Sequence, residues 1–515
     1  MYNITEKLSN EKSIKIIICL IISGLIIRFY FTPFNLPISL DGIDYFAYAV
    51  AMSREGIFPF GYLLTNFGWS SFVSIFFMFG QEQDMLTLMN LQKILSIVIS
   101  VLTVIPIYLL VKTFFRKEVA LLAATLFLFD PRIIQNSILG GTDSLFILFT
   151  ILAILFIFYK KSSLIYLSFI FVALAAFVRY EGIVLIIPLL VSYGLKNKQE
   201  KIPNIKLIIG ISLFVLIIIP LNFINYEDTQ QTSIFAQIVH RGDFISGTII
   251  ENKPDIDDEF FATNENHTII FIENAVGGFI KYLGWVLIPT SIIFCILGVI
   301  FVPKKITKNK IIFGLFFVFL ASSSIYAYGR GFQETRYLLV LLPIIILLSG
   351  YGLNYLLKIN LKHIQIIIIF GVIVSSFIFI DYRNKDSKYE LEMYEATIFL
   401  TNIAQGVNDY NGNKYIKAVD LQNNWPELLL KGENGKMKLI TEKFPIKGFE
   451  EPLEYIKFNK NKGLTHLLIK EGDLFFDDIF INERNYSFLE KIYDSNDSDE
   501  TTKYKIFKIN YGELK

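Results

Sequence analysis

Long apolar runs recur along this chain from the N-terminus to about residue 380, and they limit its fold more than any other feature. A helix of about 20 mostly apolar residues is long enough to cross a lipid bilayer. Only 18% of the residues are charged, against about 25% in soluble domains. We therefore predict a polytopic α-helical membrane protein with about eleven transmembrane helices. The expected spans are residues 14–31, 85–111, 118–136, 142–159, 163–178, 181–195, 206–225, 277–301, 310–327, 336–357 and 362–380.

A further apolar run, residues 62–80, is interrupted by Asn66, Gly68 and several serines. The loop charges decide its interpretation, because cytoplasmic loops of membrane proteins are enriched in Lys and Arg. If 62–80 does not span and the N-terminus is cytoplasmic, the inner loops carry 18 basic residues and the outer loops 7. A spanning 62–80 would move every later basic loop outside. We therefore expect 62–80 to lie along the outer interface and the C-terminus to lie outside the cytoplasm.

From about residue 382 the chain is more charged, and its apolar segments shorten to the length of strands. Strands alternating with helices are typical of a small α/β domain. We predict an extracytoplasmic α/β domain over 382–515 and a transmembrane domain over 1–381 with outer loops 32–84 and 226–276. The expected strands are 415–419, 438–440, 464–469 and 504–509, and the expected helices are 389–404 and 452–458.

The common signatures of nucleotide-binding loops, serine hydrolases, zinc proteases and thiol redox sites are all missing from the sequence. A net charge of +1 gives no indication of a nucleic-acid partner. His240 and His267 share an outer loop with four aspartates, which allows either a metal site or a solvated acidic loop. The acidic loop is the better interpretation, so we assign no metal ligand and leave a divalent metal open as a cofactor.

Ionisable residues gather where the expected spans meet the outer face, whereas the inner face carries only loose lysine runs. Such groups are costly at membrane depth unless they pair or face a cavity, although a single one can reach water by snorkelling. The candidates are Asp41, Asp44 and Tyr45 in the first outer loop, Arg132, Asp143 at the start of 142–159, Arg179 and Glu181 between two spans, and Glu334 and Arg336 at the start of 336–357.

These residue types together indicate chemistry on a phosphate. Arginine binds phosphate through two parallel hydrogen bonds. A partly desolvated carboxylate beside another carboxylate becomes a useful general base. Both kinds at one membrane face suit a substrate with a lipid tail and an anionic head. We therefore predict transfer of a group from a lipid phosphate.

Four short segments resemble the GT-C glycosyltransferases, which use polyprenyl-phosphate sugars. The resemblance is to the branch with the protein O-mannosyltransferases and the lipid A aminoarabinose transferase, and it covers roughly residues 14–357. The segments, whose order and spacing carry it, are Asp41…Asp44-Tyr45…Tyr48-Ala49, Asp130-Pro131…Gly141-Thr142-Asp143, Phe177-Val178-Arg179-Tyr180-Glu181-Gly182, and the stretch from Arg336 to Pro343.

The resemblance implies inverting transfer of a sugar from a dolichyl- or undecaprenyl-phosphate donor to a protein, glycan or lipid acceptor. It implies Asp41 or Asp44 as general base, Asp143 as the residue that orients acceptor or base, and Arg179 and Arg336 on the lipid phosphate. The family often has adjacent Asp and Glu in the first loop, so the identity of the base is open here. The Trp-Trp-Asp-Tyr-Gly motif of oligosaccharyltransferases is missing, which disfavours that activity.

The choice between the two aspartates depends on where the local helix begins. We expect Gly42 to form a loop and Asp44 to start a helix, where a carboxylate is stabilised as the anion and is a weaker base. Asp41, before that helix, is then the preferred base, with Asp44 as its orienting partner or as a contact to the sugar.

Two other functions remain open at this stage. A transporter of an anionic or lipid-linked substrate would bind it near the bilayer midplane. A non-catalytic membrane scaffold would leave the polar residues dispersed.

Overall fold

A computed structural model describes residues 2–38, 41–56, 66–80, 83–158, 164–200, 204–223, 267–359, 363–383, 449–460, 464, 466–495 and 503–514, with five short strands between 407 and 439. Contacts divide the chain into two units. The first comprises residues 1–32, 48–83 and 87–382, and the second comprises residues 33–47, 84–86 and 383–515. The expected helix at 389–404 and most of the expected outer loop 226–276 lie outside the described residues.

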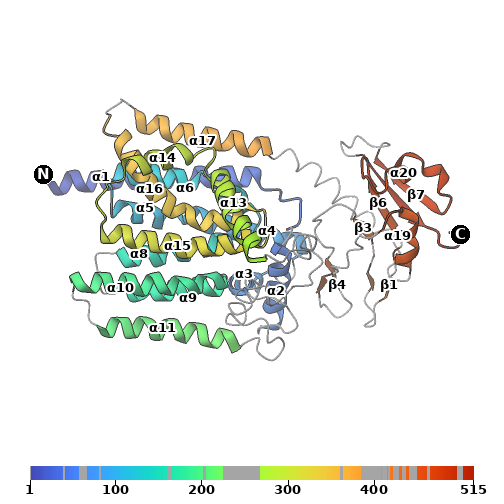
Figure 1. Ribbon diagram of the computed structural model, residues 1–515, viewed down its shortest axis with the longest axis horizontal. Helices are drawn as coiled ribbons and strands as arrows, with labels where there is room; N and C mark the ends of the chain where they lie inside the picture. The colour runs from blue at the N-terminus through green and yellow to red at the C-terminus, as the bar shows by residue number, and fades with distance from the viewer. Residues whose placement is uncertain are drawn as a thin grey trace. The chain divides into compact units, whose positions relative to one another are not determined.

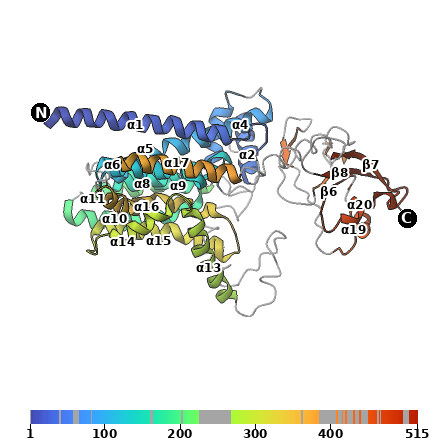
Figure 2. The ribbon, with the colours of Figure 1, turned by 90° about the horizontal axis from the view of Figure 1, so that it is seen from above.

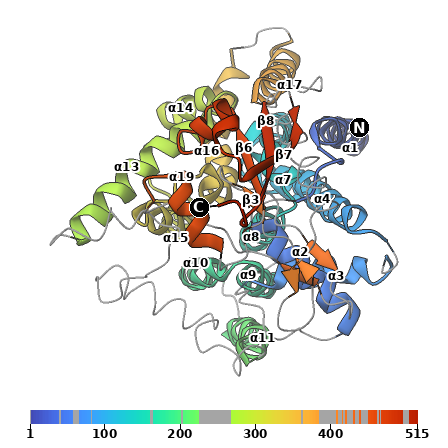
Figure 3. The same cartoon turned by 90° about the vertical axis from the view of Figure 1, so that its right-hand side faces the viewer.

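The first unit is a bundle whose helices lie mostly side by side (Figures 1 and 2), so that many are seen end-on in Figure 3. Helix α13 is inclined to the others. The elements are α1 (Tyr2–Phe31), α2 (Asp41–Glu55, shared with the second unit), α3 (Gly68–Phe77), α4 (Met85–Leu102), α5 (Val104–Lys112), α6 (Lys117–Leu128), α7 (Pro131–Ile138), α8 (Asp143–Phe158), α9 (Tyr166–Val178), η2 (Tyr180–Leu185), α10 (Ile186–Glu200), α11 (Asn204–Phe223), α13 (His267–Leu287), α14 (Ile292–Phe301), α15 (Lys308–Gly329), η4 (Thr335–Leu341), α16 (Leu342–Leu356) and α17 (Ile364–Arg383).

Six helical segments among the described residues are long and apolar enough to cross a membrane, and the class of polytopic membrane protein is confirmed. They are Ser13–Phe31, Met85–Lys112, Thr268–Leu287, Lys308–Gly329, Thr335–Leu356 and Ile364–Tyr382. Five further apolar helices are shorter, among them α8 and α9. The expected number of about eleven spans thus included short apolar helices as well as long ones.

Three expected spans are each divided between two α-helices, and in the first of them, 85–111, helices α4 and α5 are separated only at Thr103. Residues 118–136 form α6 and α7, which are separated at Asp130, because Asp130 caps α7 with hydrogen bonds from the Arg132 and Ile133 amides and Pro131 follows it. Proline is favoured in the first turn of a helix and disfavoured inside one. Residues 277–301 are divided between α13 and α14, with Pro289 in the connection.

Helix α3 covers part of the run 62–80 and has only ten residues. At 1.5 Å per residue it is about 15 Å long, half the thickness of a bilayer core. This length agrees with the expectation that 62–80 is not a full span.

Buried polar contacts join the helices of the first unit. Arg28 of α1 is fully buried, and its guanidinium donates to Gly24 O (3.1 Å), Leu128 O (3.0 Å) and Ser137 Oγ (3.1 Å). These bonds connect α1 to the end of α6 and to α7. A buried charge needs such partners to be tolerated, so Arg28 fixes the register between these helices.

The second unit contains a four-stranded mixed sheet in the order β3-β6-β8-β7, in which β3 and β6 are parallel and the other neighbours are antiparallel. Tyr455, Leu467, Ile469 and Phe507 are in its core. The α/β class of this region is as expected, although the expected strands left out β1, β4 and β7. The elements are β1 (Val407–Asn408), β2 (Lys414–Tyr415), β3 (Ala418–Asp420), β4 (Leu429–Lys431), β5 (Met437–Leu439), α19 (Pro452–Asn459), β6 (His466–Lys470), α20 (Asp477–Ile481), η7 (Glu483–Asn485), β7 (Leu489–Asp494) and β8 (Tyr504–Ile509).

Candidate functional site

A tight turn before α8 places Asp143 at the first position of that helix. Gly140 in this turn has φ +71°, a conformation that favours glycine. Its buried carbonyl accepts two hydrogen bonds, from Trp69 Nε1 of α3 and from Gln92 Nε2 of α4, both at 2.8 Å. Two donors from separate helices therefore fix the turn, and with it the position of the Asp143 carboxylate.

A second junction, between α9 and α10, places Arg179. Helix α9 ends at Val178, Arg179 is extended (φ −144°, ψ 123°), and the short 3-10 helix η2 follows at once. Gly182 lies so close to α9 that a Cβ there would be 2.5 Å from Ala176 N. Glycine therefore lets η2 fold back tightly against α9, and this close return projects the Arg179 side chain out of the junction.

Arg179 joins two carboxylates. Its Nη1 is paired with Asp143 Oδ1, and its Nη2 lies 3.5 Å from Glu181 Oε1. The three side chains are little exposed, at 14% for Arg179, 9% for Asp143 and 11% for Glu181. The guanidinium also lies 5.7 Å from the ring centroid of Phe146. This is a largely buried ion-pair cluster.

A third junction, between α15 and α16, carries the second arginine. Glu334 precedes the 3-10 helix η4, and its carboxylate lies 2.5 Å from Arg336 Nε. Arg336 Nη2 donates to the Tyr337 hydroxyl at 3.5 Å. This pair is more exposed, at 27% for Arg336 and 47% for Glu334. Helix α15 holds η4 in place, because Tyr328 and Ser324 donate to the carbonyls of Glu334 and Tyr337 (2.9 and 2.6 Å).

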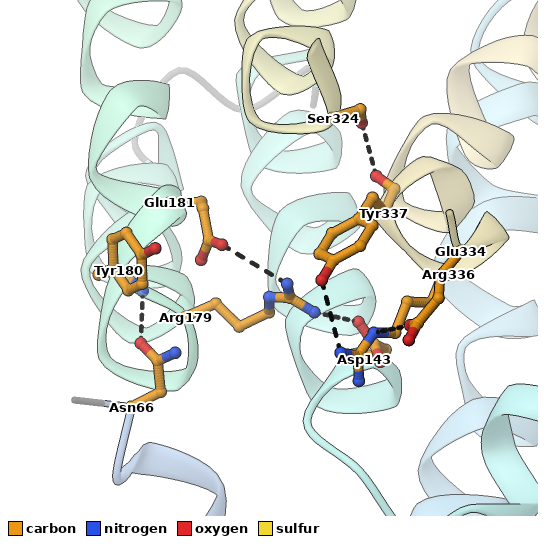
Figure 4. Close-up of polar contacts among 9 residues, drawn as sticks. All are labelled: Asn66, Asp143, Arg179, Tyr180, Glu181, Ser324, Glu334, Arg336 and Tyr337. Carbon is orange, nitrogen blue, oxygen red and sulfur yellow. Dashed lines mark hydrogen bonds and ion pairs between the residues drawn. The ribbon is translucent and has the colours of Figure 1, made fainter. Parts of the chain in front are cut away.

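The three junctions bring their side chains together. Figure 4 shows Arg179 and Arg336 pointing toward one another, with the Asp143 carboxylate between them and the Tyr337 hydroxyl above. The Asn66 side chain accepts a hydrogen bond from the Tyr180 amide at 3.0 Å, which joins the residues before α3 to the Arg179 junction.

The first-loop candidates lie on α2, whose helical residues begin at Asp41 and include Gly42. The expectation that Asp41 precedes the helix and Asp44 starts it was therefore wrong. Glycine is tolerated in the first turn of a helix, where backbone entropy costs only about 1 kcal/mol. Asp41 and Asp44 are therefore three positions apart in one helix. Asp44 is exposed and Tyr45 is half-buried.

Arg132 has a different environment from the other candidates. Its guanidinium lies 4.9 Å from the ring centroid of Phe379 in α17, and its Nη1 donates to Gln135 at 3.3 Å. It is buried. These contacts explain Arg132 as a residue that packs α7 against α17.

The sequence did not predict several residues that hold the Arg179 and Arg336 junctions in place. Trp69, Gln92 and Asn66 act through hydrogen bonds between helices that no local pattern encodes, and Tyr337 resembles an ordinary interfacial aromatic. The run Arg336-Tyr337 was a usable signal, because a tyrosine next to a predicted phosphate-binding arginine adds a hydroxyl donor.

Among the described residues, no three His, Cys, Asp or Glu side chains gather into a group that could hold a metal ion. The loop that contains His240 lies outside those residues.

Comparison with known proteins identifies the fold. Residues 89–223, which include Asp143 and Arg179, match the family model described as dolichyl-phosphate-mannose-protein mannosyltransferase. The crystal structure of ArnT from Cupriavidus metallidurans bound to undecaprenyl phosphate is similar at 9% identity, covering 96% of this chain and 98% of that chain with a TM-score of 0.55. The Archaeoglobus fulgidus oligosaccharyltransferase in complex with Zn and sulfate is 12% identical over 87% of this chain and 67% of that chain, with a TM-score of 0.49. No curated protein matches the sequence.

Proposed function

We propose that this chain, which has the fold of the GT-C glycosyltransferases, is a membrane glycosyltransferase that uses a polyprenyl-phosphate sugar. The donor carries dolichyl or undecaprenyl phosphate, and the acceptor is a hydroxyl of a protein, glycan or lipid. The observation that carries the proposal is the buried Asp143–Arg179 pair facing Arg336. Asp143 and Arg179 lie within the matched segment 89–223, and Arg336 lies outside it.

The proposed reaction inverts the anomeric carbon. A carboxylate of α2, Asp41 or Asp44, takes the proton of the acceptor hydroxyl. At the same time the oxygen of that hydroxyl forms a bond to the anomeric carbon. The bond from that carbon to the phosphate oxygen breaks, and the polyprenyl phosphate leaves with one additional negative charge. A cation beside the leaving phosphate stabilises this charge in the transition state more than in the ground state, which is the requirement for catalysis.

The two arginines differ in how readily they can meet a phosphate. Arg179 is held by Asp143 and Glu181 in a largely buried cluster. Arg336 is paired with a carboxylate that is nearly half exposed, and exposed ion pairs are weak, at about 0–1 kcal/mol. In the proposal Arg336 turns from Glu334 to the donor phosphate, whereas Arg179 keeps Asp143 oriented toward the acceptor or the base.

The position of the cluster favours this function over transport. Asp143 begins α8, Arg179 follows the end of α9, and Arg336 lies in η4 just before α16. All three therefore lie at helix ends. A transporter's site is expected near the bilayer midplane, at interrupted helices.

The base is also part of the proposal. Both aspartates lie in the first turn of α2, where the helix N-terminus stabilises a carboxylate as the anion. The reason for preferring Asp41, its expected place before the helix, therefore no longer holds. Asp44, which is exposed, is an equal candidate, and the single variants Asp41→Asn and Asp44→Asn separate the two.

The orientation in the membrane completes the proposal. The excess of basic residues in alternate loops puts the N-terminus in the cytoplasm and residues 382–515 outside it. A reporter that is active only in the cytoplasm, fused after Lys515, should be silent, and the same reporter fused after Glu200 should be active. A bright signal at Lys515 would contradict the orientation and place the site on the other membrane face.

The function is tested with purified protein in detergent, a panel of radiolabelled polyprenyl-phosphate sugars, and membrane extract as the source of acceptor. We expect transfer of label from at least one donor by the wild type and none by the double variant Asp41→Asn/Asp44→Asn. Glu334→Gln, which lies outside the proposed transfer step, is the matched control and should remain active. Uptake of label into vesicles without covalent transfer would reject the enzyme and favour a transporter.

A further inference from the structure

A separate cavity lies at the other end of the bundle from the candidate site. It has a volume of about 270 Å³ and is lined by residues of α5, α8, α10 and α15 and their flanks, namely Thr113, Phe114, Phe158, Leu195, Lys196, Lys308, Asn309 and Ile312. Helix α8 shows the separation, because Asp143 is its first residue and Phe158 its last. At 1.5 Å per residue these ends are about 22 Å apart. The cavity is therefore not part of the site proposed for glycosyl transfer.

The floor of the cavity is aromatic, because Phe114 and Phe158 line it and the ring of Phe313 packs against both. The rings of Phe114, Phe158 and Phe313 pack against each other, with centroid distances of 5.0 Å, 5.1 Å and 4.7 Å. Phe158 and Ile312 are buried. Aromatic pairs at these distances are stabilising beyond their buried area. The cavity thus has a preformed apolar base, as binding pockets generally do.

Apart from Leu195 and Ile312, the remaining lining is basic and polar. Lys196 of α10 donates a hydrogen bond to Ile157 O and lies 5.7 Å from the ring centroid of Phe158, so its ammonium is fixed beside the floor. Lys308 and Asn309 are the first two residues of the 22-residue helix α15, whose positive end adds to their charge and hydrogen-bonding capacity. No acidic residue is among the described residues that line the cavity. Two ammonium groups and an amide over an apolar floor are complementary to a phosphate group with an apolar attachment, whereas the Thr113 hydroxyl already donates to Leu110 O.

We propose that this cavity binds a phosphate group, carried by an anionic membrane lipid or by a free phosphate compound. Basic pockets between transmembrane helices are a recurring way of holding lipid headgroups at one face of a membrane. The volume is near the lower bound of about 300 Å³ for ligand pockets, which fits a headgroup better than a whole lipid. The site is independent of the proposed glycosyltransferase activity, since none of its residues belongs to the Asp143 cluster.

The test uses the full-length protein in neutral-detergent micelles, titrated with fluorescently labelled phosphatidylglycerol and, in parallel, with labelled phosphatidylcholine. The wild type should bind the anionic lipid in preference to the neutral one. The double variant Lys196→Gln/Lys308→Gln should bind phosphatidylglycerol roughly thirtyfold more weakly, because each lysine contributes several-fold near an anionic headgroup. Equal affinity of wild type and double variant would overturn the proposal.

Lys304→Gln/Lys305→Gln is the matched control, since it removes the same charge from exposed residues just before α15 that do not line the cavity. It should change affinity by less than about threefold at physiological salt, because exposed charges are screened. An equal loss in the control would mean diffuse attraction and would also overturn the site.

Asn309→Glu covers the case in which the double variant does not fold. Asn309 is exposed, and an acidic residue in the first turn of a helix stabilises it, so folding should be kept while anion binding is weakened. Unchanged binding in this variant would count against the site. Competition by inorganic phosphate identifies a free phosphate compound as the ligand source, and retention of lipid in its presence identifies the headgroup.

Discussion

The junctions that carry Arg179 and Arg336 are built alike and hold their arginines differently. In each, an α-helix ends, a short 3-10 helix follows, and a second α-helix begins, with an acidic residue within two positions of the arginine. Arg179 is paired with Asp143, which is 9% exposed, whereas Arg336 is paired with Glu334, which is 47% exposed.

The difference shows that the local sequence forms the helix junction that presents each arginine. The carboxylate that pairs with the arginine then determines whether the arginine is held in place or can bind a substrate. Asp143 comes from another helix and is held by a fixed turn. Its ion pair with Arg179 is therefore expected to stay intact when substrate binds. Glu334 is two residues from Arg336 and open to water, so that pair can be exchanged for a substrate phosphate at little cost. The site therefore combines a rigid orienting pair with an adaptable arginine.

The largest expected effect lies at neither junction. If α2 supplies the base, replacing the correct aspartate by Asn should lower the transfer rate by about 10²–10⁴, with donor binding kept. Glu334→Gln removes half of an exposed pair and should lose less than about tenfold. Glu181→Gln leaves Arg179 paired with Asp143 and keeps an amide oxygen beside it, so its loss should also stay below about tenfold. The measurement is the initial rate of label transfer for Asp41→Asn and Asp44→Asn separately.

The outcome of that experiment assigns the base. If only one of the two α2 variants is inactive, that aspartate is the base and the other orients it or contacts the sugar. If both retain activity and Glu181→Gln or Glu334→Gln is inactive, the base lies at a junction and the division of roles proposed above is wrong.

The second prediction compares the stability of the two pairs. Asp143→Ala leaves the Arg179 guanidinium without its closest partner in a largely buried place, and breaking a buried pair typically costs about 3–5 kcal/mol. Glu334→Ala removes half of an exposed pair and should cost less than about 1 kcal/mol. Thermal unfolding of both variants in the same detergent measures the contrast, and equal loss would show that the two junctions are not different in kind.

A rescue makes the comparison independent of any general damage. Asp143→Leu/Arg179→Met/Glu181→Gln replaces the pair by apolar side chains and removes the charge of the second carboxylate, so that no member of the cluster is left as an unpaired buried ion. Such replacements of buried pairs are often neutral or stabilising. The triple variant should be more stable than Asp143→Ala, while transfer activity stays lost.

The third prediction concerns the donor phosphate. Lysine keeps the charge but lacks the planar fork that binds phosphate through two hydrogen bonds. Arg336→Lys should raise the KM for the donor by roughly tenfold, which is the loss of one charge-assisted hydrogen bond of about 1.5 kcal/mol. Arg179→Lys should instead lower thermal stability and kcat, with a smaller change in KM. The same change of KM in both variants would contradict the proposal that Arg336 binds the donor phosphate while Arg179 orients Asp143.

The sequence predicted the fold class and the candidate junctions, because apolar length and loop charge are properties of single segments. It placed Arg179 and Arg336 at junctions for the same reason. It failed where the chain interrupts an apolar run by local capping, as at Asp130 and Pro131, since hydrophobicity alone does not register a cap. It also misplaced the start of the α2 helix, because Gly42 was taken as a loop residue although helix first turns tolerate glycine.

Contacts between helices were beyond the sequence for a different reason. The Gly140 carbonyl accepts bonds from Trp69 and Gln92, which lie 71 and 48 positions away. Such pairings depend on the packing of three helices, and no periodicity within any one of them encodes it. The two ends of the ion pair could therefore be predicted, but the contacts that hold Asp143 in place could not.

The smallest expected effects test that support. Gln92→Leu removes one donor to Gly140 O and should cost about 1 kcal/mol. Trp69→Phe removes the other donor and also leaves a small cavity where the indole was fully buried, so it should cost about 1–3 kcal/mol. The double variant leaves the buried carbonyl without either donor, and because an unsatisfied buried group costs about 1–3 kcal/mol, its loss of stability should exceed the sum of the singles. Ser322→Ala, at an exposed position where the hydroxyl bonds only within its own helix turn, is the control and should be neutral.

The same double variant tests whether the turn at Gly140 positions Asp143. If it does, the double variant should also lose transfer activity, while the KM for the donor, which depends on Arg336, stays unchanged. Additive stability losses with full activity would mean that the turn is held by α8 itself, and the rigid half of the comparison between the two junctions would then rest on the ion pair alone.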